Sequence, residues 1–397
     1  MKIKNKGRKI YKTKEKNFYG KSIPNKIFSA GLTVLFLSGV VFLGYSVAEP
    51  IMNYTKKKGD NSVPIVAETS STESSSDMSS SLDSSMDFPD AVSSSFYCAS
   101  LASSDLTSEN SLISAVSRLS SNSEIEYVMV PLKVKGGKLN YASKVNNAVL
   151  SGAVQSTLEL SKIVEVINDA GYKPVAYLSI LNDNIYPQTY PDAGYRTTGD
   201  GSRWLDNSLE NGGKPWLSPF SDECKNYILS IVSEVTASGF ANIVCGDVVF
   251  PPFRESDLSI LDEKVNDSER YLALTSLVNS IYSDSVSAKC PAFLEVSAAD
   301  LVSGKADVFQ PMLLQVSTVI ININMEELAA GLDVDGMYYE FKGSASDNIK
   351  KILGLLDGKF SDFNVAIRVS GTGVENADAA AIKNAINECG YKSFVLR

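Results

Sequence analysis

From residue 93 to its end, the chain alternates short apolar runs with longer amphipathic segments. The apolar runs predict strands, and the amphipathic segments, with apolar residues at helical spacing, predict helices. Such strict alternation favours a parallel sheet. The pattern predicts strands at 95–101, 127–134, 174–181, 242–250, 292–297, 318–323, 336–341, 364–369 and 393–396, and helices at 109–119, 154–170, 221–238, 269–287, 346–356 and 376–389.

The number and order of these elements favour a (β/α)8 TIM-type barrel, an α/β fold that typically takes about 250 residues. Three of the predicted helices end at a glycine (Gly171, Gly239 and Gly390), as helices commonly do. Nine strands are one too many, so either 318–323 or 336–341 is expected outside the barrel. An open, doubly wound sheet is the alternative, but the glycine-rich phosphate turn typical of its first strand is missing here.

The first 92 residues differ in composition from the rest. Residues 27–47 carry no charge and are long enough to cross a membrane core of about 30 Å as a helix. Residues 1–26 hold nine Lys and one Arg against one Glu, which predicts a single-pass protein of the cell membrane with a cytoplasmic amino terminus. A cleaved signal peptide is the alternative, although the apolar run exceeds the usual length of about 7–15 residues. Residues 48–92 are rich in serine and predict a disordered linker before a folded, extracellular domain at 93–397.

Charge and composition exclude several kinds of function. Beyond residue 58, 44 acidic residues outnumber 24 basic ones, which argues against binding of nucleic acid. The chain has no histidine, so Ser-His and Cys-His catalysis and His-ligated metal sites are excluded. Its five cysteines form no CxxC pair, and we expect neither a metal nor a cofactor. A hydrolase built on this chain has to rely on carboxylates.

Asp247 is the first candidate for such chemistry. It lies in the apolar strand predicted at 242–250, which ends at Pro251 and Pro252, because proline cannot donate a ladder hydrogen bond. The active sites of barrel enzymes lie at the carboxyl ends of the buried parallel strands, so an ionisable side chain at such a strand end is a catalytic candidate. A turn cap or a structural ion pair is the alternative role for Asp247.

The longest connection, 182–220, is expected on the same face and holds five large aromatic residues. Loops longer than about 12–15 residues are commonly functional. Exposed rings would stack on the apolar faces of sugars, whereas the alternative is a small core that packs the loop onto the barrel. The five residues are Tyr186, Tyr190, Tyr195, Trp204 and Trp216.

Four segments resemble, in order, the motifs of a bacterial glycoside hydrolase-like family catalogued as a domain of unknown function. They are 127–141 (YVMVPLKVKGGKLNY), 174–183 (PVAYLSILND), the pair Trp204-Leu205-Asp206 and Trp216-Leu217-Ser218-Pro219, and 239–252 (GFANIVCGDVVFPP). The resemblance implies a (β/α)8 barrel, carboxylate catalysis and a polysaccharide or oligosaccharide substrate. It places Asp247, Lys133 and Asp183 at motif positions. Pro131 and Phe250 stand where the motifs have an aspartate and an arginine.

Glycoside hydrolysis normally takes two carboxyls, about 5–5.5 Å apart in retaining enzymes and about 6.5–9.5 Å apart in inverting ones. We predict Asp247 as nucleophile or base, and Glu295 or Glu340 as acid, because each glutamate interrupts an apolar strand. The alternative for either glutamate is a core residue that is ion-paired with Arg368 or Lys133. The predicted substrate-binding residues are Lys133, Asp183, Tyr186, Tyr190, Trp204, Trp216, Tyr338 and Arg368.

The sequence thus predicts a membrane-anchored, extracellular glycoside hydrolase that acts on cell-wall or extracellular polysaccharide. The departures at Pro131 and Phe250 motivate a second hypothesis, a degenerate barrel that binds glycans without cleaving them. A third hypothesis is a structural partner in an envelope complex. A second carboxyl within about 10 Å of Asp247 favours the enzyme, and a single acid among several rings favours the binder.

Overall fold

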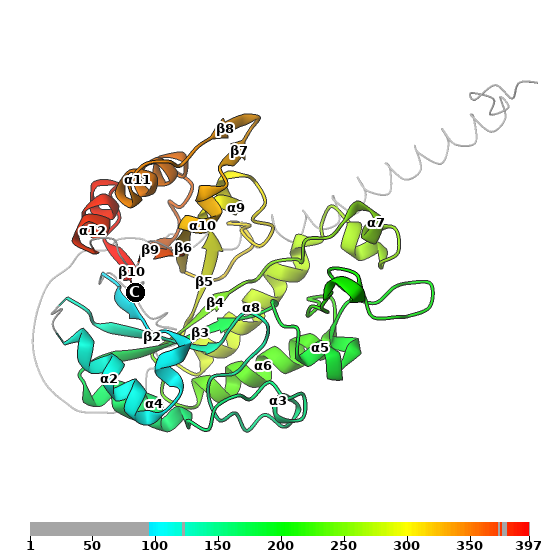
Figure 1. Ribbon diagram of the computed structural model, residues 1–397, viewed down its shortest axis with the longest axis horizontal. Helices are drawn as coiled ribbons and strands as arrows, with labels where there is room; N and C mark the ends of the chain where they lie inside the picture. The colour runs from blue at the N-terminus through cyan, green and yellow to red at the C-terminus, as the bar shows by residue number, and fades with distance from the viewer. Residues whose placement is uncertain (1–94, 121–123, 372–373, 375–378, 397) are drawn as a thin grey trace, which may run out of the picture. The chain divides into compact units, whose positions relative to one another are not determined.

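The computed structural model describes residues 95–120, 124–371, 374 and 379–396, and it contains a closed barrel of eight parallel strands (Figure 1). Around the barrel the strands follow the order β1-β10-β9-β6-β5-β4-β3-β2. Closure of the sheet confirms the predicted α/β barrel and excludes the open, doubly wound alternative. The barrel strands are β1 (Tyr97–Ser100), β2 (Tyr127–Lys133), β3 (Lys173–Ser179), β4 (Asn242–Gly246), β5 (Ala292–Ser297), β6 (Thr318–Asn324), β9 (Asn364–Ser370) and β10 (Ser393–Leu396).

The predicted tail 1–26, membrane span 27–47 and linker 48–92 lie outside the described residues. In the part of the chain that the structure describes, no helix is both long enough and apolar enough to cross a membrane. The anchor and the linker therefore stay predictions from the sequence.

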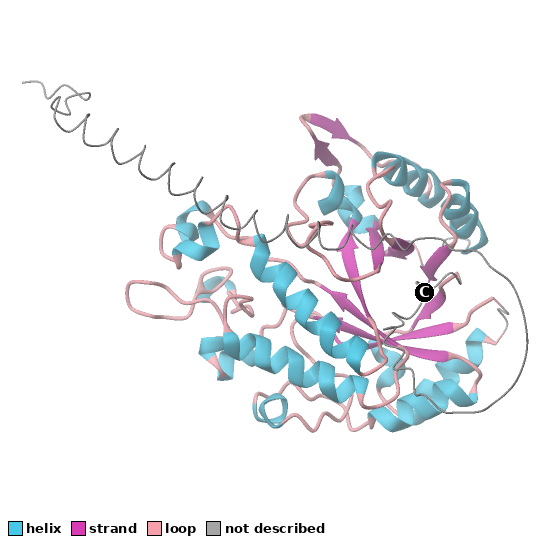
Figure 2. Ribbon diagram, turned by 180° about the vertical axis from the view of Figure 1, so that it is seen from behind, coloured by secondary structure: helices cyan, strands magenta, loops and turns pink. Residues whose placement is uncertain are grey.

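Helices cover the outside of the barrel, as the two opposite views show (Figure 1 and Figure 2). Serine caps fix where several of them begin. The Ser221 side chain accepts from the backbone N–H of Cys224 at the start of α6 (Asp222–Thr236), and Ser344 forms a capping box at the start of α11 (Ala345–Leu355). The other helices are α2 (Glu109–Leu119), α3 (Asn146–Leu150), α4 (Leu160–Asp169), α5 (Tyr186–Thr189), α7 (Glu255–Leu258), α8 (Tyr271–Ser287), α9 (Ala298–Val302), α10 (Met325–Ala329) and α12 (Ala379–Glu388), with 3-10 turns at Ser103–Leu106, Pro191–Ala193, Leu209–Asn211 and Glu263–Asn266.

The strands separate two apolar cores, one on each side of the barrel wall. On β2 the side chains of Tyr127 and Met129 belong to the inner core, whereas Val128 and Val130 belong to the outer core beneath the helices. The same alternation on β3 places Tyr177 inside the barrel. The barrel is therefore packed with side chains and is not a pore, so chemistry is confined to its ends.

The ninth predicted strand, 336–341, lies outside the barrel. It contributes β8 (Met337–Tyr339), which pairs antiparallel with β7 (Leu332–Val334) in a separate two-stranded sheet. Asp335 and Gly336 have φ values of 52° and 80°, and two successive left-handed residues make the tight turn of a hairpin. The hairpin follows β6 through α10 and projects away from the barrel (Figure 1). The prediction that one of two candidate strands lies outside the barrel is confirmed.

Candidate active site

Two carboxylates meet one tyrosine at the carboxyl-terminal mouth of the barrel. Asp247 directly follows β4, and Glu295 lies on the neighbouring strand β5. The hydroxyl oxygen of Tyr177 is 3.5 Å from Oδ2 of Asp247 and 3.4 Å from Oε1 of Glu295. Because one hydroxyl reaches both, the two oxygens are no more than about 7 Å apart, which is compatible with a pair of glycosidase carboxyls.

The backbone at the end of β4 makes room for this tyrosine. A Cβ atom at Gly246 would lie 2.3 Å from the hydroxyl oxygen of Tyr177, so the position requires glycine unless the ring moves. The next residue, Asp247, has a φ of 51°, which is uncommon for a residue other than glycine. This left-handed step ends the strand and brings the Asp247 carboxylate to the Tyr177 hydroxyl.

Arg368 reaches Glu295 from β9, two strands away around the barrel. Its Nη1 is 2.7 Å from Oε2 of Glu295, and its guanidinium carbon is 4.9 Å from the centre of the Tyr177 ring. Burial acts against the charge of Arg368, but Glu295 and Tyr177 outweigh it, and the pKa of the guanidinium is raised. Both oxygens of Glu295 therefore accept hydrogen bonds, one from Arg368 and one from Tyr177.

Sequence reasoning missed two residues of this cluster, Tyr177 and Lys135. Burial, followed by the charges of Glu295 and Asp247, raises the pKa of the Tyr177 phenol well above its ordinary value. Tyr177 is thus a neutral donor. Lys135 follows β2, its Nζ is 3.2 Å from Oδ1 of Asp247, and Asp247 is the main reason that its pKa is raised. The sequence carried no signal for Tyr177, because no alternation in the apolar run at 174–181 separates the inner face of the strand from the outer one.

Two further acids extend the negative charge along the rim. Glu327, in the first turn of α10, accepts a hydrogen bond of 2.7 Å from the hydroxyl of Ser297 at the end of β5. Asp300 lies in α9, and burial together with the charge of Glu327 raises its pKa. Within the described ranges, no three Cys, Asp or Glu side chains are grouped so that they could hold a metal ion.

A cavity of about 200 Å³ opens beside Arg368 at the same mouth. Its wall includes Pro131, at the position where the family motif has an aspartate, and the hydroxyl-bearing residues Ser100 and Ser370. The cavity can therefore hold a small polar group next to the Arg368–Glu295 contact.

Lys133 and Asp183 meet each other, but away from the two acids. Nζ of Lys133 is 3.0 Å from Oδ2 of Asp183, and neither side chain is exposed. The pairing of β2 with β3 shifts its register between Pro131 and Lys133, and the Lys133 ammonium donates to the backbone carbonyl of Ser179. Asp183 accepts from two backbone N–H groups of the loop that follows it. The pair anchors the start of the 182–220 loop.

The aromatic residues of this loop are packed and do not form an open platform. Trp204 is 3% exposed and packs in a small separate core, and Tyr186 is 1% exposed and stacks on Tyr190 and on Tyr227 of α6. Trp216 and Tyr190 keep partial exposure, and the indole N–H of Trp216 donates to a carboxylate oxygen of the same loop. The structure thus shows the small core that was one of the two sequence alternatives.

Glu340 and Tyr338 lie with the β7–β8 hairpin and are not brought to the acid pair. Glu340 directly follows β8, is exposed, and forms an ion pair of 2.8 Å with Lys342. Tyr338 is 64% exposed, and its hydroxyl donates to the carbonyl of Ala330. Of the two candidate glutamates, the structure therefore places Glu295 beside Asp247.

A closed parallel barrel with two carboxylates at its carboxyl-terminal mouth is an arrangement that TIM-barrel glycoside hydrolases use. Residues 101–340 match the family described as "Putative glycosyl hydrolase domain". The chain belongs to this family, which confirms the resemblance seen in its sequence motifs. No curated protein matches the chain.

Several solved structures are similar to the chain in fold. The PgaB (BpsB) glycoside hydrolase domain from Bordetella bronchiseptica is 12% identical over 76% of this chain and 93% of its own, with a TM-score of 0.50. The PelA glycoside hydrolase domain from Pseudomonas aeruginosa is 13% identical, with the same coverages of 76% and 93% and a TM-score of 0.39. The α-galactosidase TtGalA from Thermus thermophilus is 12% identical, with coverages of 76% and 58% and a TM-score of 0.47. At 12% identity, the likeness to the PgaB domain shows a common fold alone.

Proposed function

We propose that this chain is a glycoside hydrolase that cleaves cell-wall or extracellular polysaccharide with Asp247 and Glu295. The observation that carries the proposal is the Tyr177 hydroxyl, which lies within 3.5 Å of an oxygen of each carboxylate. Membership in a glycosyl hydrolase family supports it. The departures at Pro131 and Phe250 do not remove the carboxyl pair, because Glu295 supplies the second acid.

We assign the proton donor to Asp247 and the ionised partner to Glu295. The two oxygens of Glu295 accept from Arg368 and Tyr177, which suits a carboxylate because an ionised carboxylate can only accept. Asp247 is nearer to solvent, with 13% of its side chain exposed against 6% for Glu295, so it can exchange a proton with water between turnovers. Lys135 lies 3.2 Å from Asp247, and its exposed side chain has to turn away toward solvent before Asp247 can act as the acid. The sequence analysis suggested the opposite roles, with Asp247 as nucleophile or base and the glutamate as acid.

In the reaction that follows from these roles, Asp247 gives its proton to the glycosidic oxygen as the bond to the leaving sugar breaks. A carboxylate oxygen of Glu295 forms a bond to the anomeric carbon, and water then hydrolyses that bond while Asp247 takes a proton back. The upper limit of about 7 Å on the oxygen separation includes the spacing of retaining enzymes and only the lower edge of the inverting range. Retention of configuration is therefore the expected outcome.

A barrel that binds glycans without cleaving them is the second candidate. The contact between Arg368 and Glu295 favours it, because Glu295 is 7% exposed and a nucleophile must reach the sugar. A third candidate, a structural partner in an envelope complex, requires neither binding nor cleavage of a glycan. The three candidates differ in what they do to a polymer.

Incubation of the full-length protein with purified cell-wall and extracellular polysaccharides tests the proposal. The hydrolase predicts new reducing ends and shorter fragments. The binder predicts that the protein is retained on the polymer while the number of reducing ends stays constant. Neither retention nor new reducing ends would contradict both of these candidates and leave the structural partner.

We also propose that residues 27–47 hold the barrel at the outer face of a bacterial cell membrane, with residues 1–26 in the cytoplasm and 48–92 as a spacer. The uncharged run and its basic flank support this topology. Alkaline carbonate extraction of membranes tests it, because a spanning chain stays in the pellet. Release of a shortened chain into the supernatant would instead indicate a cleaved signal peptide.

A further inference from the structure

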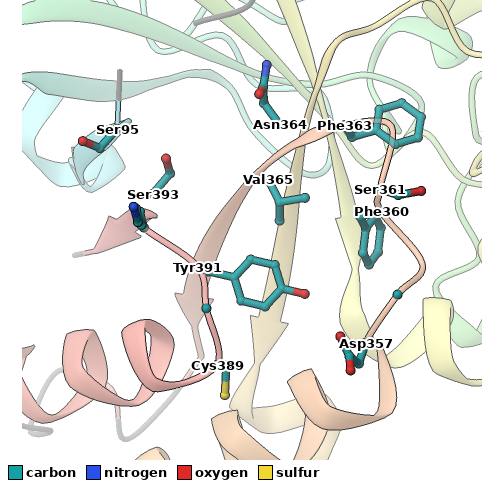
Figure 3. Close-up of a pocket in the computed structure, with 13 residues that line it drawn as sticks. Ser95, Asp357, Phe360, Ser361, Phe363, Asn364, Val365, Cys389, Tyr391 and Ser393 are labelled. Carbon is teal, nitrogen blue, oxygen red and sulfur yellow. The ribbon is translucent and has the colours of Figure 1, made fainter. Parts of the chain in front are cut away.

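A hollow of about 700 Å³ lies at the amino-terminal end of the barrel strands (Figure 3). Its lining includes Asn364 and Ser393, the first residues of β9 and β10, and Ser95, which precedes β1 by two residues. Asp247 and Glu295 lie at the opposite, carboxyl-terminal end of the barrel. The hydrolysis proposed above makes no use of this hollow.

Two loops form the facing walls of the hollow. The loop after α11 carries Asp357, Phe360 and Phe363, and the loop between α12 and β10 carries Tyr391 and Lys392. Figure 3 shows the ring of Tyr391 extending into the hollow toward Phe360 and Asp357 on the opposite wall. The rings of Phe360 and Phe363 pack on Phe309, so the half-buried ring of Tyr391 and the two charged groups are what the concave surface presents.

The charged groups of the hollow are available to a ligand. Among the described residues, neither the carboxylate of Asp357 nor the ammonium of Lys392 has a hydrogen bond or an ion pair. Burial, followed by the charge of Asp357, raises the pKa of Tyr391, so its phenol is a neutral donor near an anionic acceptor. The side-chain amide of Asn364 adds a further donor and acceptor to the lining.

The combination of groups indicates the chemical class of the ligand. One carboxylate and one ammonium give the lining no net charge. A strongly charged ligand would therefore be repelled by whichever of the two groups has the same sign of charge. Mixed donors and acceptors match hydroxyl groups, which can do both. The Tyr391 ring, which extends into the hollow, offers a face to the apolar C–H surface of a pyranose ring. We propose that this hollow is a second binding site for neutral glycan, separate from the catalytic mouth.

Such a site would hold a polymer at a point remote from the bond that is cleaved. Two contacts with one chain raise the local concentration of that chain at each of them. A short oligosaccharide cannot reach both ends of the barrel and would gain nothing. Glycan binding in the hollow does not require that the carboxyl-terminal mouth be catalytic. The two proposals can therefore be tested independently of each other.

Affinity electrophoresis of the full-length protein in gels that contain dextran, hydroxyethyl cellulose or galactomannan measures this binding. We expect at least one of the three to retard the wild-type protein. Tyr391→Ala should bind about tenfold more weakly because it loses a ring and a hydroxyl. Asp357→Asn should bind about three- to tenfold more weakly because an interaction with a charged acceptor is lost. Asp362→Asn, an exposed acid of the same loop that does not line the hollow, is the matched control and should bind as the wild type does.

Two further measurements distinguish loss of binding in the hollow from loss of catalysis at the mouth and from loss of folding. Asp247→Asn should be retarded as strongly as the wild type even where it no longer releases reducing ends. Thermal melting reports the folding of each variant, and the conservative, exposed Asp357→Asn covers the case in which Tyr391→Ala does not fold. Absence of wild-type retardation on all three polymers would overturn the proposal. Undiminished retardation of both hollow variants would overturn it as well.

Discussion

The Tyr177 hydroxyl occupies the space that a side chain at position 246 would need, with an ideal Cβ on Gly246 only 2.3 Å from its oxygen. The same hydroxyl is the group that touches both Asp247 and Glu295. The geometry of the acid pair thus depends on the absence of one methyl group in β4.

Gly246→Ala should therefore disturb both stability and activity. We expect a loss of about 1–3 kcal/mol in the free energy of unfolding, because the added methyl forces the Tyr177 ring to move. Urea denaturation measures this loss. Gly354→Ala, in α11 with nothing within 4 Å of its Cβ, is the control and should be neutral or stabilising by up to about 1 kcal/mol. Equal stability and activity in Gly246→Ala and the wild type would show that the contact is not required.

Tyr177→Phe keeps the ring and removes the shared donor. We expect kcat for polysaccharide hydrolysis to fall about 10- to 100-fold, because hydrogen bonds to charged groups contribute about 1.5–3 kcal/mol. KM should change little, because Tyr177 is buried beneath the acids. Tyr127→Phe, elsewhere in the same inner core, serves as the control and should retain the wild-type kcat. A change in KM alone would contradict the role given to the hydroxyl.

Arg368→Met should be strongly destabilising because it leaves the charge of Glu295 buried without its partner. We expect a cost of about 3–5 kcal/mol in the free energy of unfolding. Combining it with Glu295→Gln removes both charges and should recover part of this loss. Denaturation of the wild type, both single variants and the double variant gives the coupling free energy. Strictly additive effects would mean that the 2.7 Å contact contributes nothing to stability.

Asp300→Asn should stabilise the protein at neutral pH. Burial and Glu327 raise the pKa of Asp300, so the folded chain holds this proton more tightly than the unfolded chain does. The resulting stabilisation of the wild type is fully present below the ordinary value of 3.8 and is lost as the pH rises through the raised folded value. Thermal melting across this range should show a gap in favour of Asp300→Asn that grows with pH. A gap that shrinks with pH would contradict the sign of the shift.

The barrel could be predicted from the sequence because parallel strands that are buried on both faces appear as continuous apolar runs. The same property hid Tyr177. Within the run at 174–181 no polar alternation separates the inner face from the outer one, so nothing marked this residue as pointing toward Asp247. Asp247 was found because prolines end its strand, which places the carboxylate at the carboxyl-terminal edge of the barrel.

The placement of Lys133 could not be predicted from its motif. A register shift between Pro131 and Lys133 alters which face of the strand the side chain occupies, and such a shift leaves no trace in the hydrophobic pattern. Glu340 was misleading for a different reason. Its run at 336–341 resembles a buried strand in composition, but the tight turn at Asp335 and Gly336 folds it back as a surface hairpin.

The most direct test of the account compares the release of reducing ends by Asp247→Asn and by Asp362→Asn on a polysaccharide that the wild type cleaves. Both variants replace one carboxylate by an amide of the same shape, but only Asp247 contacts Tyr177 at the catalytic mouth. The account predicts that Asp247→Asn loses hydrolysis by at least about 100-fold with unchanged melting behaviour, since the general acid is removed. Asp362→Asn should cleave as the wild type does. Full hydrolysis by Asp247→Asn would contradict the assignment of the active site.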